Sequence, residues 1–314
     1  MLNRRHIRIK VMQLIYAFQG GESDDLKIQE RLLDKSMTGM YELYLLLIDL
    51  MIKVVDKAEN HLQIAKQKHL ATEADKNPNY KFISNSILST IKANETLLEA
   101  LGTHKITNWD FDDEYVDVIF RSTIKSDLYD KYMGSQKMSI EEDRDFILKW
   151  FKTIIAPNEK LYDYFEDKKI TWLDDLPVVN TLIVKVLKKL NDDNASDLLV
   201  PDLFKDKDDK QFGIDLLNKT ILNTTSLNEE IAEKTMNWDK DRIANIDLVL
   251  LQMAITELKK FPSIPIKVTI NEYLEIAKEY STPKSSVFVN GILDKLVKEY
   301  QAKGTLNKMG RGLM

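Results

Sequence analysis

Apolar residues recur three and four positions apart over most of this chain, which is the spacing of helices that bury one face. Sustained alternation of apolar and polar residues, which would indicate half-buried strands, is missing. Glycine and proline are scarce, with 10 and 7 residues in 314, and most of them separate the periodic segments. The pattern therefore predicts an all-α fold.

One dipeptide tests this prediction, because Asn290-Gly291 between apolar residues is the strongest short signal for a β-hairpin. The apolar residues around it instead form a helical stripe: Phe288, Val289, Ile292, Leu293, Leu296, Val297 and Tyr300. We predict a helix over about 284–301, with Thr282-Pro283 at its start. The dipeptide lies on the side away from the stripe, where glycine is expected to allow close approach of a neighbouring helix or ligand.

The first helix should run from about Arg4 to Gln19 and end at Gly20-Gly21. The apolar spacing from Asp24 to Leu70 predicts two helices, of which the second is unusually long. The turn residues Asn77-Pro78-Asn79 end this helical pattern. Residues 191–210 indicate a polar linker. Further helices are expected at about 84–101, 112–133, 140–155, 158–167, 176–190, 211–223, 227–236, 240–260 and 266–280.

The tripeptide Asn-Trp-Asp occurs twice, at 108–110 and 237–239, each time before a predicted helix. At the second site Asp239 can cap the helix while Trp238 packs onto Ile243. Two copies without a fixed period do not make a repeat, so we interpret them as shared capping chemistry.

The residue inventory excludes most catalytic sites. No cysteine is present, which excludes disulfides, thiol nucleophiles and thiolate-bound metals. No phosphate-binding or dinucleotide-binding glycine loop occurs. Carboxylate runs such as Glu141-Glu142-Asp143 are typical of solvated helix starts. We therefore expect that the protein is not an enzyme and has no catalytic residue and no cofactor. We also expect no metal site, because no two of the four histidines stand at the spacing of metal ligands on a helix; they are His6, His61, His69 and His104.

The most apolar run, Tyr44 to Val55, is too short to span a bilayer and contains Asp49 and Lys53. Lys10 and Gln13 interrupt the apolar residues that a signal peptide would need. We therefore expect no membrane partner and a cytoplasmic protein, with which the absence of cysteine is compatible.

Charge is unevenly distributed along the chain. The net charge is −5, yet residues 1–20 carry +4 and residues 303–314 carry +3, which leaves −12 for the rest. An acidic body with two basic ends favours a local contact with a polyanion over a broad nucleic-acid groove.

The first helix carries most of this local basic charge. Its expected core stripe consists of Ile7, Val11, Leu14, Ile15 and Phe18. A neighbouring, accessible edge is predicted to hold Arg5, Arg8, Met12 and Tyr16, with Arg4 close by. Such an edge could hold phosphates and stack a base. An ordinary solvated helix end and an arginine-rich mitochondrial presequence are the open alternatives.

Four segments together carry a family resemblance. They are RRHIRIKVMQLIYAFQ (4–19), DRIANIDLVLLQMAITEL (241–258), IPIKVTINEYLEIAKEY (264–280) and FVNGILDK (288–295). In this order they resemble the NusB transcription antitermination family, including its arginine-rich opening and the Leu14-Ile15-Tyr16 turn.

The resemblance implies NusB-like helical bundles with additional inserted helices. It predicts a NusB-like first helix at 1–20, an extra helical region at 21–207, a NusB-like C-terminal domain at 208–302 and a basic flexible tail at 303–314. The extra helices are expected to enlarge a bundle, shield a surface or recruit a partner, and the resemblance does not choose among these.

Members of the family bind boxA-like single-stranded RNA together with a NusE-type small-subunit ribosomal protein. They act within the transcription elongation complex during ribosomal RNA transcription. By position, the resemblance implies phosphate contacts by Arg4, Arg5 and Arg8, a base or partner contact by Tyr16, and a partner contact by Asp247. At the start of the last helix it implies RNA contacts by Lys284, Ser285 and Phe288.

Two residues depart from the family pattern. His6 stands where an arginine is common, so its charge depends on pH. Lys284 stands where an acid is common, and it either adds a phosphate contact or marks a rearranged interface.

Two other functions compete with RNA binding in antitermination. Some RNA cytosine methyltransferases carry a NusB-like domain, but this chain lacks the methyl-donor loop and the nucleophilic cysteine. A helical protein-interaction scaffold that keeps the fold without binding RNA stays open, because the body is acidic and the extra region is large.

Overall fold

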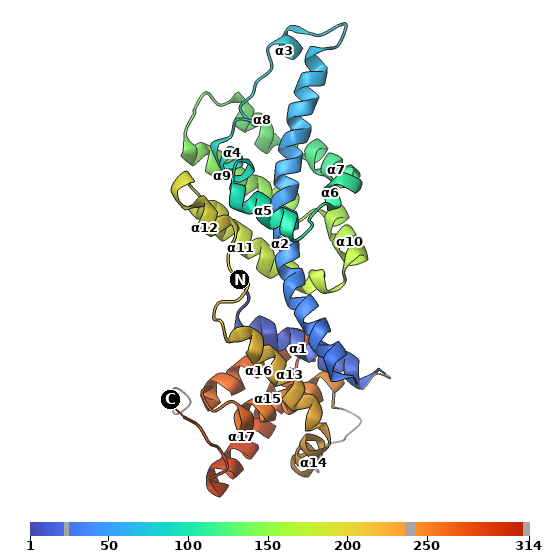
Figure 1. Ribbon diagram of the computed structural model, residues 1–314, viewed down its shortest axis with the longest axis vertical. Coiled ribbons are helices and arrows are strands. Elements are labelled where there is room, and N and C mark those ends of the chain that lie inside the picture. Colours follow the sequence, from blue (N-terminus) through green and yellow to red (C-terminus); the bar gives the residue numbers. More distant parts are fainter. Residues whose placement is uncertain (22–24, 236–242, 310–314) are drawn as a thin grey trace. The chain divides into compact units, whose positions relative to one another are not determined.

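The computed structural model describes residues 1–21, 25–235 and 243–309 (Figure 1). Within these ranges the regular structure is helical, and the sole pairing of extended backbone is an isolated parallel bridge between Leu2 and Phe204. The predicted all-α class is thereby confirmed, and the protein contains a second set of helices beyond the resembling segments.

The chain forms two compact units. One unit contains residues 2–37 and 204–314, and the other contains Met1 with residues 38–203. We call them the terminal unit and the inserted unit. Helix α2 (Leu26–Lys66) contributes residues to both.

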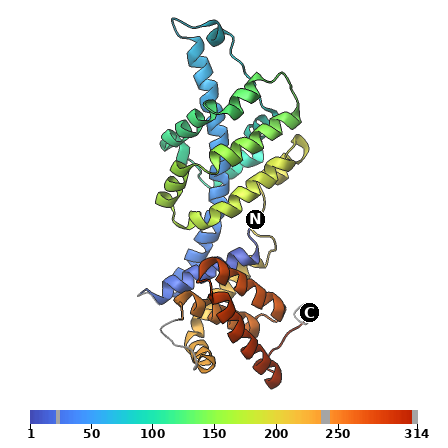
Figure 2. The ribbon, with the colours of Figure 1, turned by 180° about the vertical axis from the view of Figure 1, so that it is seen from behind.

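The terminal unit is built around α15 (Asn245–Lys260), a helix that is buried on nearly all sides. Helix α1 (Arg4–Gln19) packs against α15 and α13 (Asp209–Leu222), which place the start of the chain inside this unit. Helices α16 (Ile266–Tyr280) and α17 (Ser285–Lys303) cover another side of α15, as their orange and red ribbons show in Figure 2. The remaining helix is α14 (Thr224–Lys234).

The inserted unit packs short helices around the part of α2 that follows Met37. Its core contains large aromatic side chains such as Tyr44, Phe82, Trp109 and Trp150. In chain order the helices are α3 (Glu73–Lys76), α4 (Ser86–Lys92), α5 (Glu95–Thr103), α6 (Asn108–Phe111), α7 (Asp113–Ile124), α8 (Asp127–Gly134), α9 (Ile140–Trp150), a π-helical turn (Phe151–Ile155), α10 (Glu159–Lys168), α11 (Thr171–Lys189), a 3-10 turn (Asp192–Asn194) and α12 (Ala195–Leu199).

Several helix boundaries differ from the prediction. Two helices were expected between Asp24 and Leu70, but α2 is a single helix of 41 residues. The expected helix 84–101 divides before α5, because the Asn94 side chain accepts the backbone N–H of Leu97 and starts a new helix. Ser126 divides the expected helix 112–133 in the same way. The predicted linker 191–210 is not wholly irregular, since it contains α12.

The capping interpretation of Asn-Trp-Asp is wrong at 108–110. Asn108 begins α6, and its side chain donates to the Tyr164 hydroxyl instead of capping a helix. Trp109 is buried and donates its indole N–H to the backbone carbonyl of Leu46. The second copy, with Trp238 and Asp239, lies outside the described residues.

Helix α17 runs through Asn290-Gly291, which confirms the predicted helix and excludes the hairpin. The helix begins at Ser285 rather than at Thr282-Pro283. A Cβ atom placed on Gly291 would meet nothing within 4 Å. The expected close approach of a neighbouring helix is therefore wrong for the described part of the chain.

In the described ranges, every helix is too short or too polar to cross a membrane.

We expect Gly291→Ala to stabilise the terminal unit by about 1 kcal/mol, because the position is helical and faces open space. Gly213→Ala is the contrasting variant, since its Cβ would lie 2.8 Å from Cγ2 of Ile7. That substitution should destabilise the protein by about 1–3 kcal/mol. Urea denaturation of both variants measures the difference, and an equal loss of stability in the two would contradict an open environment at Gly291.

Candidate nucleic-acid interface

Helix α1 begins with a capping box. The side chain of Asn3 accepts the backbone N–H of His6 at 3.0 Å, and the ring of His6 accepts the backbone N–H of Asn3 at 3.5 Å. This start fixes the first turn of α1 and places Arg4 and Arg5 in it, with Arg8 one turn later. Positive charge at a helix N-terminus is unfavourable, so these guanidinium groups need other partners.

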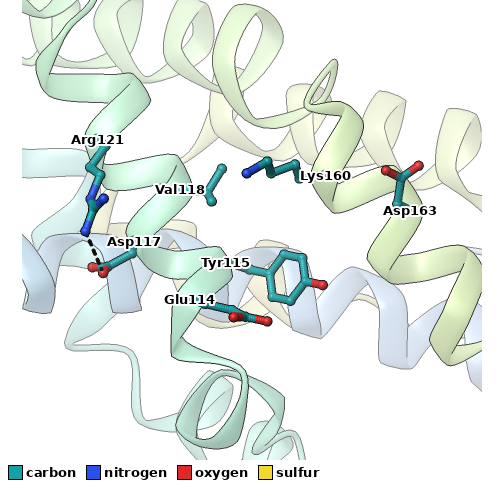
Figure 3. Close-up of a pocket in the computed structure, with 7 residues that line it drawn as sticks. All are labelled: Glu114, Tyr115, Asp117, Val118, Arg121, Lys160 and Asp163. Atoms are coloured by element: carbon teal, nitrogen blue, oxygen red, sulfur yellow. Dashed lines mark hydrogen bonds and ion pairs between the residues drawn. The ribbon is translucent and has the colours of Figure 1, made fainter.

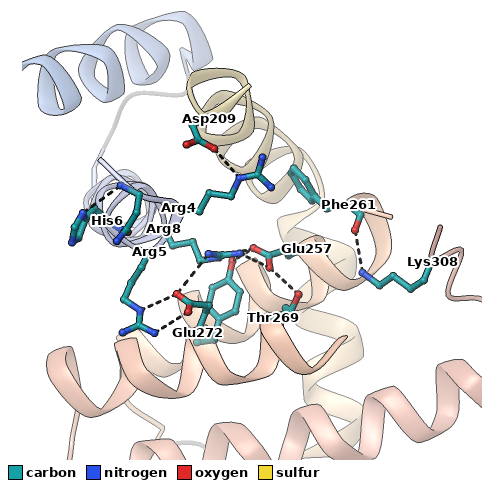
Figure 4. Close-up of polar contacts among 12 residues, drawn as sticks. Arg4, Arg5, His6, Arg8, Asp209, Glu257, Phe261, Thr269, Glu272 and Lys308 are labelled. Carbon is teal, nitrogen blue, oxygen red and sulfur yellow. Dashed lines mark hydrogen bonds and ion pairs between the residues drawn. The ribbon is translucent and has the colours of Figure 1, made fainter. Parts of the chain in front are cut away.

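Arg8 is buried, with 3% of its side chain exposed, and this corrects the expectation that it lies on an accessible edge. Its Nε and Nη2 each donate to the carboxylate of Glu257 at 2.8 Å (Figure 4). Thr269 and Tyr273 donate to the same carboxylate at 2.8 and 3.3 Å. Burial acts to lower the pKa of Arg8, but the charge and hydrogen bonds of Glu257 outweigh it and raise the pKa.

Arg5 is half-exposed and forms a two-bond ion pair with Glu272. Its Nε and Nη2 each donate at 2.8 Å to that carboxylate, while Nη1 has no hydrogen bond among the described residues (Figure 4). The hydrogen bond with Arg5 is the main cause that lowers the pKa of Glu272 and raises the pKa of Arg5. Arg5 therefore keeps one free edge for a further acceptor.

Arg4 is also half-exposed and is held by Asp209, which accepts from its Nε at 2.8 Å. The guanidinium lies 5.0 Å from the centre of the Phe212 ring. Within the described part of the chain, Nη1 and Nη2 of Arg4 make no hydrogen bond. These two nitrogens and Nη1 of Arg5 are the free donors of the α1 start.

His6 lies between the arginines and does not add a charge near neutral pH. Burial, followed by the charges of Lys10 and Arg5, lowers the pKa of His6 to about 4. The predicted pH dependence at this position therefore falls in the acidic range, and at neutral pH the ring accepts from Asn3 as an uncharged imidazole.

The start of α1 forms one wall of a groove of about 840 Å³. The segment before α13 forms another wall, and the start of α16 supplies apolar side chains. All of these residues belong to the terminal unit. The lining residues are Asn3, Arg4, Arg5, His6, Arg8, Asp206, Asp208, Ser263, Ile264, Pro265, Val268 and Glu272.

Of the other residues predicted to contact RNA or a partner, some are exposed and some are buried. Tyr16 and Lys284 are exposed, at the far half of α1 and at the residue before α17. Ser285 is buried and donates to Asp247, which is also buried and accepts from Ser281 as well. Asp247 and Ser285 thus tie the start of α15 to the start of α17. The RNA contact of Ser285 and the partner contact of Asp247 stay predictions. The structure shows in addition that their hydrogen bond joins two helices of the terminal unit.

The resemblance implies an RNA contact by Phe288, in the first turn of α17. Only 8% of it is exposed, so it packs within the terminal unit. The neighbouring Val287 is the exposed apolar side chain of this turn.

A second hollow of about 480 Å³ lies in the inserted unit between α7 and α10 (Figure 3). It is open, mixes three carboxylates with two cations, and includes none of the predicted site residues. Its lining residues are Glu114, Tyr115, Asp117, Val118, Arg121, Lys160 and Asp163. Among the described residues, no group of three or more side chains is suited to hold a metal ion.

A model of the NusB family matches residues 179–298. This range covers the groove residues from Asp206 onward and does not include α1. The transcription antitermination protein NusB of Salinibacter ruber is 44% identical over 112 residues, which cover 36% of this chain and 70% of that protein. The protein of the same name from Chloroherpeton thalassium is 42% identical over 130 residues, which cover 41% of this chain and 62% of that protein.

The protein of the same name from Geotalea uraniireducens is 41% identical over 85 residues, which cover 27% of this chain and 59% of that protein. This chain therefore spans between 59% and 70% of the length of these three relatives. No solved structure matches it significantly. The comparisons confirm the predicted resemblance and agree with the prediction of a non-enzymatic protein.

We expect Arg8→Met to destabilise the terminal unit by about 3–5 kcal/mol, because it leaves the buried carboxylate of Glu257 without its counter-charge. The double variant Arg8→Met with Glu257→Met should recover most of this loss. Arg121→Met, at an exposed site, is the control and should change the free energy of unfolding by less than about 0.5 kcal/mol. Chemical denaturation measures all three, and a harmless single Arg8 variant would contradict the buried pair.

Phe288→Ala should cost about 3–5 kcal/mol of stability, the usual range for a core phenylalanine. The affinity of the folded fraction for RNA should stay within about twofold, corresponding to less than about 0.4 kcal/mol. Thermal denaturation beside an RNA titration separates the two effects. A loss of affinity without a loss of stability would instead support the implied RNA contact.

Proposed function

The chain belongs to the NusB family, and from this premise we propose that it is an RNA-binding transcription antitermination factor. It binds boxA-like single-stranded RNA together with a NusE-type small-subunit ribosomal protein, within the transcription elongation complex during ribosomal RNA transcription. A cytoplasmic location is part of this proposal.

The main support in the structure is the pair of half-exposed arginines at the start of α1. Arg4 and Arg5 lie on the same groove, and their carboxylate partners leave Nη donors of both side chains free. Free guanidinium donors on a groove bind phosphate oxygens well, because the hydrogen bonds are charge-assisted. Arg8 acts indirectly, since its bond to Glu257 anchors the helix that carries the other two.

Two exposed residues extend the proposed surface. Tyr16 is 48% exposed on α1 and has an aromatic face on which a base can stack. Lys284 is exposed before α17 and supplies a further positive charge for the backbone.

A protein-interaction scaffold without RNA binding is the second candidate function. One observation favours it: each of the three arginines of α1 has a carboxylate partner within the protein. RNA must therefore compete with Asp209 and Glu272 for part of the guanidinium charge. Measured RNA affinity distinguishes the two functions.

We expect the double variant Arg4→Gln with Arg5→Gln to bind every single-stranded RNA more weakly. Each lost phosphate contact should reduce the slope of log affinity against log salt by about 0.7, so the double variant should lose about 1.4. Glutamine keeps an N–H donor for Asp209 and Glu272, which limits damage to the fold. Fluorescence anisotropy on a boxA-like oligonucleotide between 50 and 200 mM salt provides the measurement.

The matched control is Arg31→Gln with Arg121→Gln, which removes the same charge from exposed positions on α2 and α7. It should keep the parent slope. If the Arg4 and Arg5 variant also keeps the parent affinity and slope, the scaffold function is favoured. Adding the NusE-type protein tests the partner, which should tighten RNA binding by the parent chain.

A further inference from the structure

The groove beside α1 contains two acidic residues that the proposed phosphate contacts do not explain. Asp206 and Asp208 line it together with Arg4 and Arg5, and both are exposed. Among the described residues, neither side-chain carboxylate makes a hydrogen bond or ion pair. Carboxylates in this position repel the phosphates that the arginines attract.

The position of this acidic wall is fixed by contacts on both sides. Phe204 forms the parallel bridge with Leu2, just before α1. The backbone N–H of Asp206 donates to the carboxylate of Asp209 at 3.2 Å, and the same carboxylate holds Arg4. Asp206 and Asp208 are thus held at a set place in the groove that Arg4 and Arg5 also line.

Stabilisation of a helix start does not account for both acids. Asp208 is the residue before α13, but its side chain accepts no capping hydrogen bond. Asp206 lies outside the helix. Asp209, in the first turn, is the acid that is buried and paired.

The groove offers each part of a nucleotide a different environment. Guanidinium groups suit the phosphate, and Pro265 with the 43% exposed Val268 gives an apolar surface for a base or ribose. An ionised carboxylate only accepts hydrogen bonds, so its partners in RNA are the N–H groups of bases and the ribose hydroxyl. The volume of about 840 Å³ is within the usual range for small-molecule sites, about 300–1,000 Å³.

We propose that Asp206 and Asp208 read a guanine base in this groove while Arg4 and Arg5 hold the adjoining phosphates. Guanine presents N1–H and the N2 amino group side by side, which match the two oxygens of one carboxylate. Cytosine and adenine present one amino group and uracil one imino group on that edge. The inference rests on the proposed RNA binding and adds base selectivity to it.

The test uses three oligouridines of about ten nucleotides, with guanosine, inosine or uridine at the central position. Inosine lacks only the N2 amino group. One hydrogen bond to a charged group contributes about 1.5–3 kcal/mol, so the parent protein should bind the guanosine oligonucleotide at least about tenfold more tightly than the other two. Asp206→Asn with Asp208→Asn should reduce this preference to within about twofold, and the two single variants identify the carboxylate involved.

Asp163→Asn with Asp167→Asn is the matched control, because it removes two exposed carboxylates from α10 of the inserted unit. It should keep the guanosine preference, and thermal denaturation should show that all variants fold. Equal tightening of all three RNAs by the Asp206 and Asp208 variant would show simple repulsion of phosphate and overturn the proposal. Unchanged binding of all three would also overturn it.

Failure of the proposed function gives a different result. In that case the parent binds none of the oligonucleotides, or the Arg4 and Arg5 variant binds them as the parent does. Loss of guanosine preference in the aspartate variant, with weaker binding of all RNAs in the arginine variant, supports both proposals together.

Discussion

The terminal unit depends on one buried ion pair, between Arg8 and Glu257. Moving two charges out of water costs several kcal/mol for each ion, and the pair is stable only where geometry and further hydrogen bonds compensate. Both conditions hold here. Two hydrogen bonds of 2.8 Å join the pair, and the hydroxyls of Thr269 and Tyr273 donate further hydrogen bonds to the Glu257 carboxylate. The pair sets the rotation of α1 about its axis. That rotation in turn directs Arg4 and Arg5 toward the groove.

Charge along the sequence is a poor guide to charge in space. The first 20 residues carry +4, yet Arg8 and Lys10 are buried, and the two exposed arginines are paired with acids from distant segments. At the level of whole units the distribution is clearer. The inserted unit has 21 basic against 29 acidic side chains and a charge of −8, and the terminal unit has 24 against 21 and a charge of +3. Net charge therefore favours binding of a polyanion to the terminal unit and opposes its binding to the inserted unit.

The helices with local start and stop signals could be predicted from the sequence. The bounds of α1 are confirmed at Arg4 and Gln19, and α16 occupies 266–280 as expected. The breaks at Asn94 and Ser126 were missed, because a single polar cap within an apolar period is indistinguishable from a residue on the solvent face. The site was predicted less well. Nothing near Arg8 in the sequence shows that its partner stands 249 positions later.

That separation has a consequence for synthesis in the cell. At about 5–20 residues per second, Arg8 is made roughly 12–50 s before Glu257. Until α13 and α15 are made, α1 lacks its counter-charge and the two helices against which it packs. Residues 38–203 form, with Met1, a compact unit of their own, so their core can close while the ribosome is still at work. The part of the chain that is made first is thus among the last to find its native contacts, and a nascent chain interrupted before α15 exposes an apolar helix to chaperones and proteases.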